Sequence, residues 1–164
     1  MNILALAKKY APMAIAAFTA VIFLDSLRYK FTDHPNTQEI FGRLDQWAAT
    51  IGAPGLFSHT GLFSQYVIGS AELVASILLL VGIVPALVRL QALGALIAVA
   101  VMSGAISFHL FTPLGVDPNN DGGGLFKAAV GVWVLSFVML ALRRRELVSL
   151  GGDLAKAIIP RPKA

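Results

Sequence analysis

The sequence predicts an all-α polytopic membrane protein, a four transmembrane helix bundle with an amphipathic surface helix in the first outer loop. Hydrophobic residues make up 57% of the 164-residue chain and charged residues only 13%, which is more apolar than a soluble domain of this length. Apolar runs recur along the chain, each reaching or approaching the ~20 residues that cross a ~30 Å hydrocarbon layer. Lysine and arginine gather at the ends of these runs.

The first apolar run, at about residues 10–27, follows Lys8 and Lys9 and resembles a secretory signal in this respect. No small-residue cleavage site closes it, and Asp25, Arg28 and Lys30 follow at once, so we expect an uncleaved membrane helix. Three further helices are predicted at about 62–87, 90–111 and 125–142. Residues 1–145 then form the transmembrane domain, and 146–164 form a cytoplasmic tail that is at most a short surface helix.

The loop after the first helix carries its own helical pattern. Apolar residues recur at helical spacing between Thr37 and Ile51, with charged and amide residues between them, and Gly52 ends the run. Asn36 and Glu39 have the spacing of a helix cap and its reciprocal acid. We expect an amphipathic helix at 37–51 that lies on the outer membrane surface or caps the bundle.

Small residues and a calcium-like loop mark the second half of the chain. Gly94 with Ala98, and Ala100 with Gly104, are spaced so that neighbouring helices can approach closely. The loop 112–124 matches the first half of a calcium-loop spacing, but its twelfth position is Ala128 instead of a bidentate glutamate. Tight turns use the same residues, and we favour that interpretation.

The charge distribution predicts the orientation. Lys8, Lys9, Arg89 and the run Arg143 to Arg145 collect on one side of the predicted membrane, so both termini should be cytoplasmic in a bacterial inner membrane. The formal charge of +4 is explained by lipid headgroups and topology, since the positive residues form no aromatic-studded patch for nucleic acid. The chain has no cysteine, which excludes a CxxC redox pair, a thiolate nucleophile and a disulfide framework.

Glu72 is the residue that most needs an explanation. It lies in an apolar run, where a carboxylate is expensive unless it has a partner or a purpose. Gln65, Gly69, Glu72 and Ser76 share one helical face, which should point into the bundle. Several other polar residues fall on the same outer side of the membrane. The candidates for an outward-opening polar pocket are Glu72, Lys30, His109, Arg28, Asp25, Gln65, Ser107, Asp121 and Lys127.

Two interpretations of these residues stay open. Either they line a pocket, or Glu72 is clamped by Arg28, Lys127 or serine hydroxyls to fix helix packing. We predict no metal site, because no ligand pair has i, i+4 spacing on one helix, and no pair of histidines suits haem. No residue pattern assigns a catalytic group.

The residues around Glu72 resemble a known family. The first helix ends in Leu27-Arg28-Tyr29-Lys30-Phe31-Thr32, Gly69-x-x-Glu72 follows in the second, and a helix rich in small residues comes third. This arrangement, over roughly residues 11–142, is similar to the DoxX-like group of four-helix bacterial membrane proteins. Lys30, Gly69 and Glu72 match its motif positions. The resemblance implies an inner-membrane protein; relatives include the small subunit of a thiosulfate:quinone oxidoreductase, and more distant ones act as cargo receptors or assembly factors.

Two main functions follow as hypotheses. The first is a quinone-linked or redox-associated accessory subunit with a polar pocket in the outer half of the bundle, the quinone being its candidate ligand. The second is a non-catalytic scaffold, assembly factor or chaperone that uses the 37–51 helix and small-residue faces. A small-solute or proton pathway is a third. In each, the partners are the lipid bilayer and a membrane or periplasmic protein or a second copy of the chain, and catalysis by the chain alone is not expected.

Overall fold

The computed structural model describes residues 2–158, and within them the chain is helical with no strand. The all-α prediction is therefore confirmed. The helices are α1 (Ile3–Lys30), α2 (Pro35–Thr50), α3 (Gln65–Val81), a 3₁₀ turn (Pro85–Leu87), α4 (Arg89–Phe111), α5 (Gly124–Leu142) and α6 (Arg144–Ile158).

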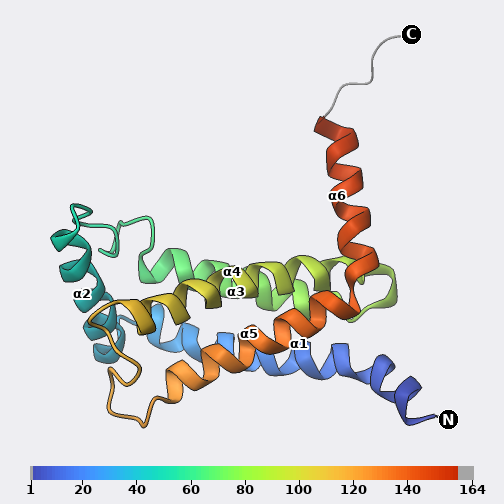
Figure 1. Cartoon of the computed structure of the whole chain (residues 1–164), viewed down its shortest axis with the longest axis horizontal. Helices are drawn as coiled ribbons and strands as arrows, with labels where there is room; N and C mark the ends of the chain where they lie inside the picture. Colours follow the sequence, from blue (N-terminus) through green and yellow to red (C-terminus); the bar gives the residue numbers. More distant parts are fainter. Residues whose placement is uncertain (1, 159–164) are drawn as a thin grey trace.

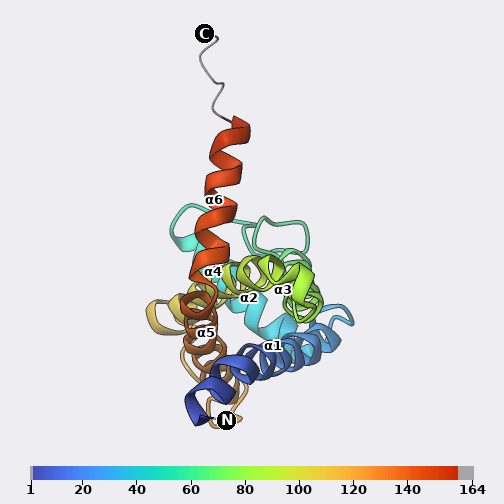
Figure 2. The ribbon, with the colours of Figure 1, turned by 90° about the vertical axis from the view of Figure 1, so that its right-hand side faces the viewer.

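Helices α1, α3, α4 and α5 run side by side and form an elongated bundle (Figure 1). Seen end-on, α3 and α4 lie together above α1 and α5 (Figure 2). Extensive interfaces join α1 to α3, α3 to α4 and α4 to α5, while the interface between α1 and α5 is smaller. Helix α2 lies across one end of the bundle, and α6 leaves from the other end, where the chain also begins (Figure 1).

Within residues 2–158, three helical segments are long and apolar enough to cross a membrane: Lys9–Lys30, Arg89–Phe111 and Gly124–Leu142. The fourth predicted span is shorter than the apolar run 62–87. Helix α3 has 17 residues because the Ser64 side chain caps its start by accepting a hydrogen bond from the backbone N–H of Val67, and Gly82 caps its end after Val81. Its role as a span therefore stays a prediction.

The small residues of α4 have two different roles. A Cβ atom on Gly94 would lie 2.9 Å from the backbone oxygen of Ala75 and 3.0 Å from the backbone nitrogen of Leu79, so this glycine lets α3 and α4 touch. Ala98 is fully buried in the same core. The second pair, Ala100 and Gly104, instead lines a cavity. The prediction of close helix approach is confirmed for the first pair and wrong for the second, because spacing alone does not identify what faces a residue.

Helix α2 closes one end of the bundle. Leu44 and Ala48 pack with Phe57 and Leu114, which come from the loops that follow α2 and α4. The helix begins after His34, whose Nδ1 accepts a hydrogen bond from the backbone N–H of Asn36. The predicted cap by Asn36 and Glu39 is therefore wrong, and Glu39 pairs with Arg43 instead.

The loop 112–124 is built as a series of turns. The Asp117 carboxylate accepts a hydrogen bond from the backbone N–H of Asp121, and the Asp121 carboxylate accepts one from Gly124. Asn120, Gly122 and Gly123 have positive φ angles, which glycine and asparagine tolerate best. The carboxylates of the calcium-like pattern thus hold the backbone of the loop, as the turn interpretation predicted.

The predicted tail is a helix over the whole of its described length, 146–158. Helix α6 buries none of its residues and stands across the long axis of the bundle (Figure 1). The last six residues of the predicted tail, 159–164, lie outside the described residues.

Candidate functional site

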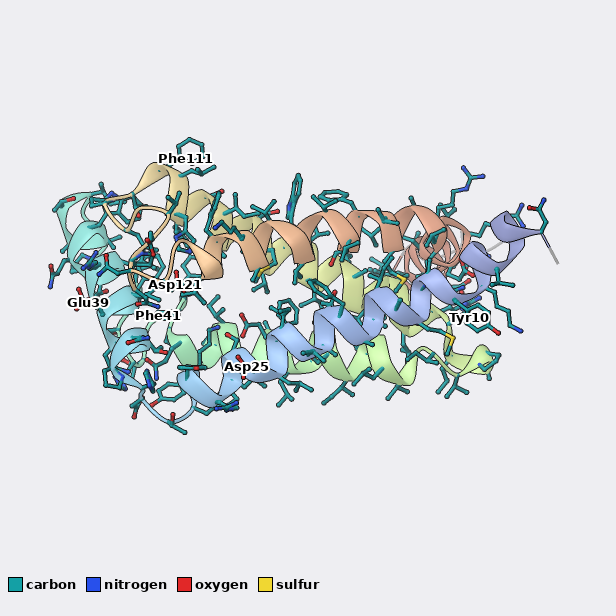
Figure 3. The ribbon with its side chains drawn as sticks, turned by 90° about the horizontal axis from the view of Figure 1, so that it is seen from below. Tyr10, Asp25, Glu39, Phe41, Phe111 and Asp121 are labelled. Carbon is teal, nitrogen blue, oxygen red and sulfur yellow. The ribbon has the colours of Figure 1, made fainter. Side chains whose placement is uncertain are left out.

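A cavity of about 820 Å³ lies at the α2 end of the bundle. Its walls come from α1, α2, α4 and α5, with Glu72 and Ile68 contributed by α3, and most of its lining is apolar. Figure 3 shows Asp25, Phe41 and Asp121, which belong to this lining, near the end of the bundle that α2 covers. A volume of this size is typical of small-molecule sites, which range from about 300 to 1,000 Å³.

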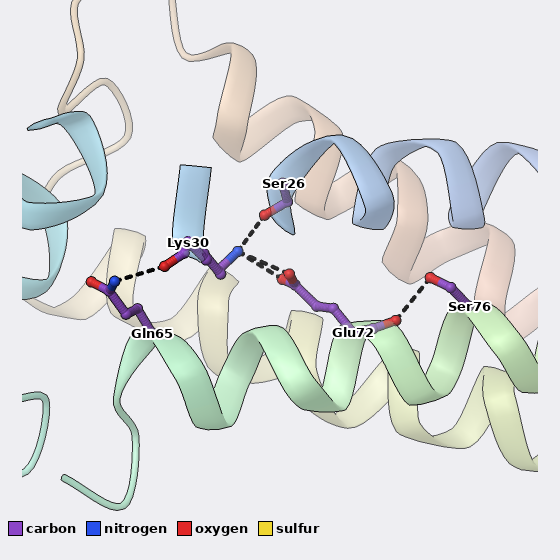
Figure 4. A network of polar contacts seen from close by, with 5 residues as sticks. All are labelled: Ser26, Lys30, Gln65, Glu72 and Ser76. Carbon is purple, nitrogen blue, oxygen red and sulfur yellow. Dashed lines mark hydrogen bonds and ion pairs between the residues drawn. The ribbon is translucent and has the colours of Figure 1, made fainter. Parts of the chain in front are cut away.

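The polar centre of the cavity wall is an ion pair between α1 and α3 (Figure 4). Nζ of Lys30 lies 3.0 Å from Oε1 and 2.9 Å from Oε2 of Glu72. The Glu72 side chain is 3% exposed and the Lys30 side chain 14%. The Lys30 ammonium also donates to the Ser26 hydroxyl, one helical turn earlier. Its three protons therefore all have acceptors, which is what a buried ammonium requires.

Gly69 allows this pair to form. A Cβ atom at position 69 would lie 3.3 Å from Cζ of Phe31 and 3.4 Å from Cδ of Lys30. Glycine therefore gives the end of α1 room to lie against α3, with Lys30 level with Glu72. The three residues on which the family resemblance rests, Lys30, Gly69 and Glu72, thus meet at one place in the fold.

A second polar network fixes the chain that leaves α1. Nε2 of Gln65 donates to the backbone oxygen of Lys30 at 2.7 Å and to Oδ1 of Asp33 at 2.6 Å. The Tyr66 hydroxyl donates to the same Asp33 oxygen at 2.6 Å. These donors favour the charged carboxylate, so the Tyr66 hydroxyl first, and then Gln65, hold the pKa of Asp33 below its usual value. Nε2 of Gln38 in α2 also donates a hydrogen bond to Oε1 of Gln65 at 2.8 Å.

Five of the nine predicted pocket residues line the cavity: Lys30, Glu72, Asp25, His109 and Asp121. His109 is 8% exposed, and its Nδ1 lies 2.6 Å from the backbone oxygen of Gly115. Because a carbonyl oxygen can only accept, Nδ1 carries the proton, and Nε2 of a neutral ring is an acceptor. The histidine therefore brings a hydrogen-bonding group to the α4 side of the same cavity.

The other four predicted residues lie outside the cavity lining. Gln65 is buried in the network around Asp33, and Ser107 is exposed on α4. Arg28 pairs with Asp25 on the surface, and Lys127 donates to the backbone oxygen of Gly122. The hypothesis that Arg28 or Lys127 clamps Glu72 is wrong, since Lys30 is its cation. Arg28 lies two residues before Lys30 and so points to another side of α1.

Ser26 was not among the sequence candidates, although its position four residues before Lys30 was a usable signal. Two other hydroxyl-bearing residues of the bundle, Ser103 and Thr19, lie outside the cavity lining. The Ser103 hydroxyl accepts a hydrogen bond from Nε1 of Trp133, and Thr19 is fully buried. In the part of the chain that the structure describes, no three His, Cys, Asp or Glu side chains group as metal ligands.

Comparisons of the chain with protein-family models, with curated proteins and with solved structures found no match. The site combines a largely apolar cavity, a charge pair with no net charge and a histidine with a free ring nitrogen. The two other carboxylates of the lining are engaged elsewhere, Asp25 with Arg28 and Asp121 with the loop backbone. Such a site suits an uncharged, largely apolar molecule with hydrogen-bond acceptors or donors on its head.

Proposed function

We propose that the chain is a four-span membrane protein of the DoxX-like type that binds a quinone-like amphiphile in the cavity beside Lys30 and Glu72. The observation that carries the proposal is the position of this cavity, at one end of a bundle whose outer surface is apolar. Exposed large hydrophobic residues occur on all four bundle helices, including Phe18 on α1, Ile77 on α3, Leu96 on α4 and Phe137 on α5. Helix α3 packs between α1 and α4 and runs beside them along the bundle.

The length of α3 fits this assignment. Its 17 residues span about 26 Å at ~1.5 Å per residue, slightly less than a ~30 Å hydrocarbon layer. Its one charged side chain, Glu72, is turned inward and paired with Lys30. Charges within membrane spans are tolerated when they face the bundle interior and have a partner.

The residues of the cavity fit a quinone-type head. A quinone ring is uncharged and carries carbonyl oxygens that accept hydrogen bonds, and its apolar tail suits the apolar lining. The Ser26 hydroxyl supplies a donor on the α1 side, and Nε2 of His109 supplies an acceptor on the α4 side for a hydroxyl of the head group. When bound, a quinone would supply two-electron redox chemistry, for which the cysteine-free chain offers no thiol partner. An accessory role in a redox-associated complex therefore fits better than independent catalysis.

Within this proposal the chain binds, orients and shields the head group. Ile22, Ile68 and Phe108 contribute apolar side chains to the lining around the head group. Glu72 brings a carboxylate and His109 an imidazole ring to the lining, and Lys30 holds the Glu72 carboxylate in place. The redox partner would be a separate protein in or beside the same membrane, with both termini of this chain on the cytoplasmic side of a bacterial inner membrane.

The scaffold hypothesis receives less support. The Gly94 and Ala98 face is occupied by α3 within the bundle, and the Ala100 and Gly104 face borders the cavity. The apolar side of α2 packs on Phe57 and Leu114. The surfaces that the sequence assigned to a protein partner are thus used within the chain.

The test is extraction of lipid-soluble compounds from protein purified out of native membranes, followed by chromatography with ultraviolet detection. We expect a quinone in proportion to the wild-type protein and little in Gly104→Leu, which fills the cavity without removing a polar group. The matched control is Ala141→Leu, at an exposed position near the inner end of α5, which should keep the compound. Equal amounts in all three proteins, or none in any, would contradict the proposal. A stoichiometric protein partner retained by Gly104→Leu without any quinone would favour the scaffold.

A further inference from the structure

Helix α6 (Arg144–Ile158) has an unpartnered amphipathic surface at the end of the bundle opposite the cavity. Leu147, Leu150, Leu154 and Ile158 recur at spacings of three and four residues and form one stripe. Arg145, Ser149, Asp153 and Lys156 form the opposite side. The stripe ends in open space: Leu154 is 62% exposed and Ile158 is 68% exposed.

The direction of α6 is set by contacts with α4. Nε and Nη2 of Arg143 donate to Oε1 of Gln91 at 2.9 and 2.6 Å, directly before α6 begins. Nη1 of Arg89 lies 3.0 Å from Oδ2 of Asp153. The first contact fixes the residue before α6, and the second holds the polar side of α6 to the first residue of α4. These contacts with α4 hold the helix across the long axis of the bundle (Figure 1).

The charges of this region are unbalanced. Asp153 is paired with Arg89 at 3.0 Å, and Glu146 lies 4.0 Å from Arg143. Among the residues that the structure describes, Arg144, Arg145 and Lys156 have no acidic partner within ion-pair distance. The polar side of the helix is thus basic, and its acids are already neutralised by cations of the same end.

We propose that α6 lies in the plane of the membrane surface and binds anionic lipid headgroups, with the Leu147 to Ile158 stripe in the acyl boundary. A helix that crosses a bundle of membrane-spanning helices lies parallel to the bilayer. A stripe of leucines and isoleucine opposite basic residues is the pattern of helices that bury their apolar side about 5–10 Å into the interface. Basic side chains beside a bilayer are attracted to anionic lipids.

The chain is well suited to a direct test, because it has no cysteine and accepts single labels. The full-length protein is placed in nanodiscs of phosphatidylcholine, with or without phosphatidylglycerol, and a nitroxide is attached at Leu154→Cys or at Ser149→Cys. Collision of the nitroxide with oxygen and with a water-soluble nickel complex is measured. We expect a several-fold higher ratio of oxygen to nickel collisions at position 154 than at position 149, and a larger difference with phosphatidylglycerol.

Charge variants separate the lipid from other occupants of the stripe. Arg144→Gln with Arg145→Gln should reduce the difference between the two positions only in discs that contain phosphatidylglycerol. Similar ratios at positions 154 and 149 would overturn the proposal by placing the whole helix in water. If the nitroxide at position 154 collides rarely with both oxygen and the nickel complex, and dipolar broadening shows that two nitroxides lie close together, the stripe is covered by a second copy of the chain and the proposal is overturned. Equal depth in both kinds of disc would overturn the assignment to anionic lipid. The collision ratios at positions 154 and 149 do not depend on the cavity. This proposal can therefore fail or hold independently of quinone binding.

Discussion

Replacing Lys30 by methionine is expected to destabilise the bundle strongly. The substitution keeps the length and apolar stem of the side chain but leaves the Glu72 carboxylate, 3% exposed, without its two hydrogen bonds of 2.9 and 3.0 Å. Removing one partner of a buried pair costs about 3–5 kcal/mol, because the remaining charge is buried and uncompensated. We expect the lower end of this range, because the cavity borders Glu72 and can admit water to it.

A double-mutant cycle separates the interaction energy between Lys30 and Glu72 from the effect of removing each side chain alone. Glu72→Met alone leaves the Lys30 ammonium with Ser26 as its remaining acceptor, so we expect a loss of about 2–4 kcal/mol. The double variant, with methionine at both positions, has no buried charge and should lose less than either single variant. Arg28→Met is the matched control on the same helix. Its pair with Asp25 is exposed, and such pairs contribute about 0.2–1 kcal/mol.

The measurement is the free energy of unfolding of the purified protein in mixed micelles, titrated with a denaturing detergent. The fluorescence of Trp133, which is hydrogen-bonded to Ser103 between α5 and α4, reports on the bundle. A Trp47→Phe background removes the signal from α2. If Lys30→Met loses no more stability than Arg28→Met, or if the two methionine substitutions simply add, the pair does not hold α1 to α3 and the reasoning fails.

Three further predictions concern other parts of the fold. Gly94→Ala should destabilise the bundle by about 1–3 kcal/mol in the same titration, because the new methyl group would lie 2.9 Å from atoms of α3. Gly104→Ala is the control: the nearest atom to its new methyl group belongs to Phe108, at 3.8 Å. It should be neutral or stabilise the bundle by about 0.5–1 kcal/mol. Arg143→Ala should cost about 1–3 kcal/mol by leaving a buried amide oxygen without donors, whereas Arg145→Ala in detergent should change little. The lowered pKa of Asp33 means that its carboxylate stabilises the folded state above its ordinary pKa, and that this is lost as the pH falls through the lowered value. The rate of hydrogen exchange at the backbone amides of α2 should therefore rise in acid. The Asp33→Asn variant should show this faster exchange already at neutral pH. An unchanged exchange rate in the variant would refute the prediction.

The sequence by itself determined the helices and the inward face of α3. Helical periodicity is local, so the spacing of Gln65, Gly69, Glu72 and Ser76 was sufficient to predict that one side of the helix is buried, and all four are buried. Composition was sufficient to predict apolar helices of membrane-spanning length at 90–111 and 125–142, close to the observed α4 and α5. The helix ends were less predictable, because capping by Ser64 and His34 depends on how the chain turns.

Only the tertiary structure decided what each polar residue faces. The sequence suggested Arg28 or Lys127 as the cation that clamps Glu72, whereas the rotation of α1 against α3 brings Lys30 to this carboxylate. The same rotation leaves Arg28 on the surface. The packing of α4 turns Ala100 and Gly104 toward the cavity, which their spacing did not indicate. Likewise, the direction of α6 depends on Arg143 reaching Gln91, 52 positions earlier in the chain. A one-dimensional pattern specifies which side of a helix is polar, whereas the partner of that side depends on the relative rotation and level of two helices.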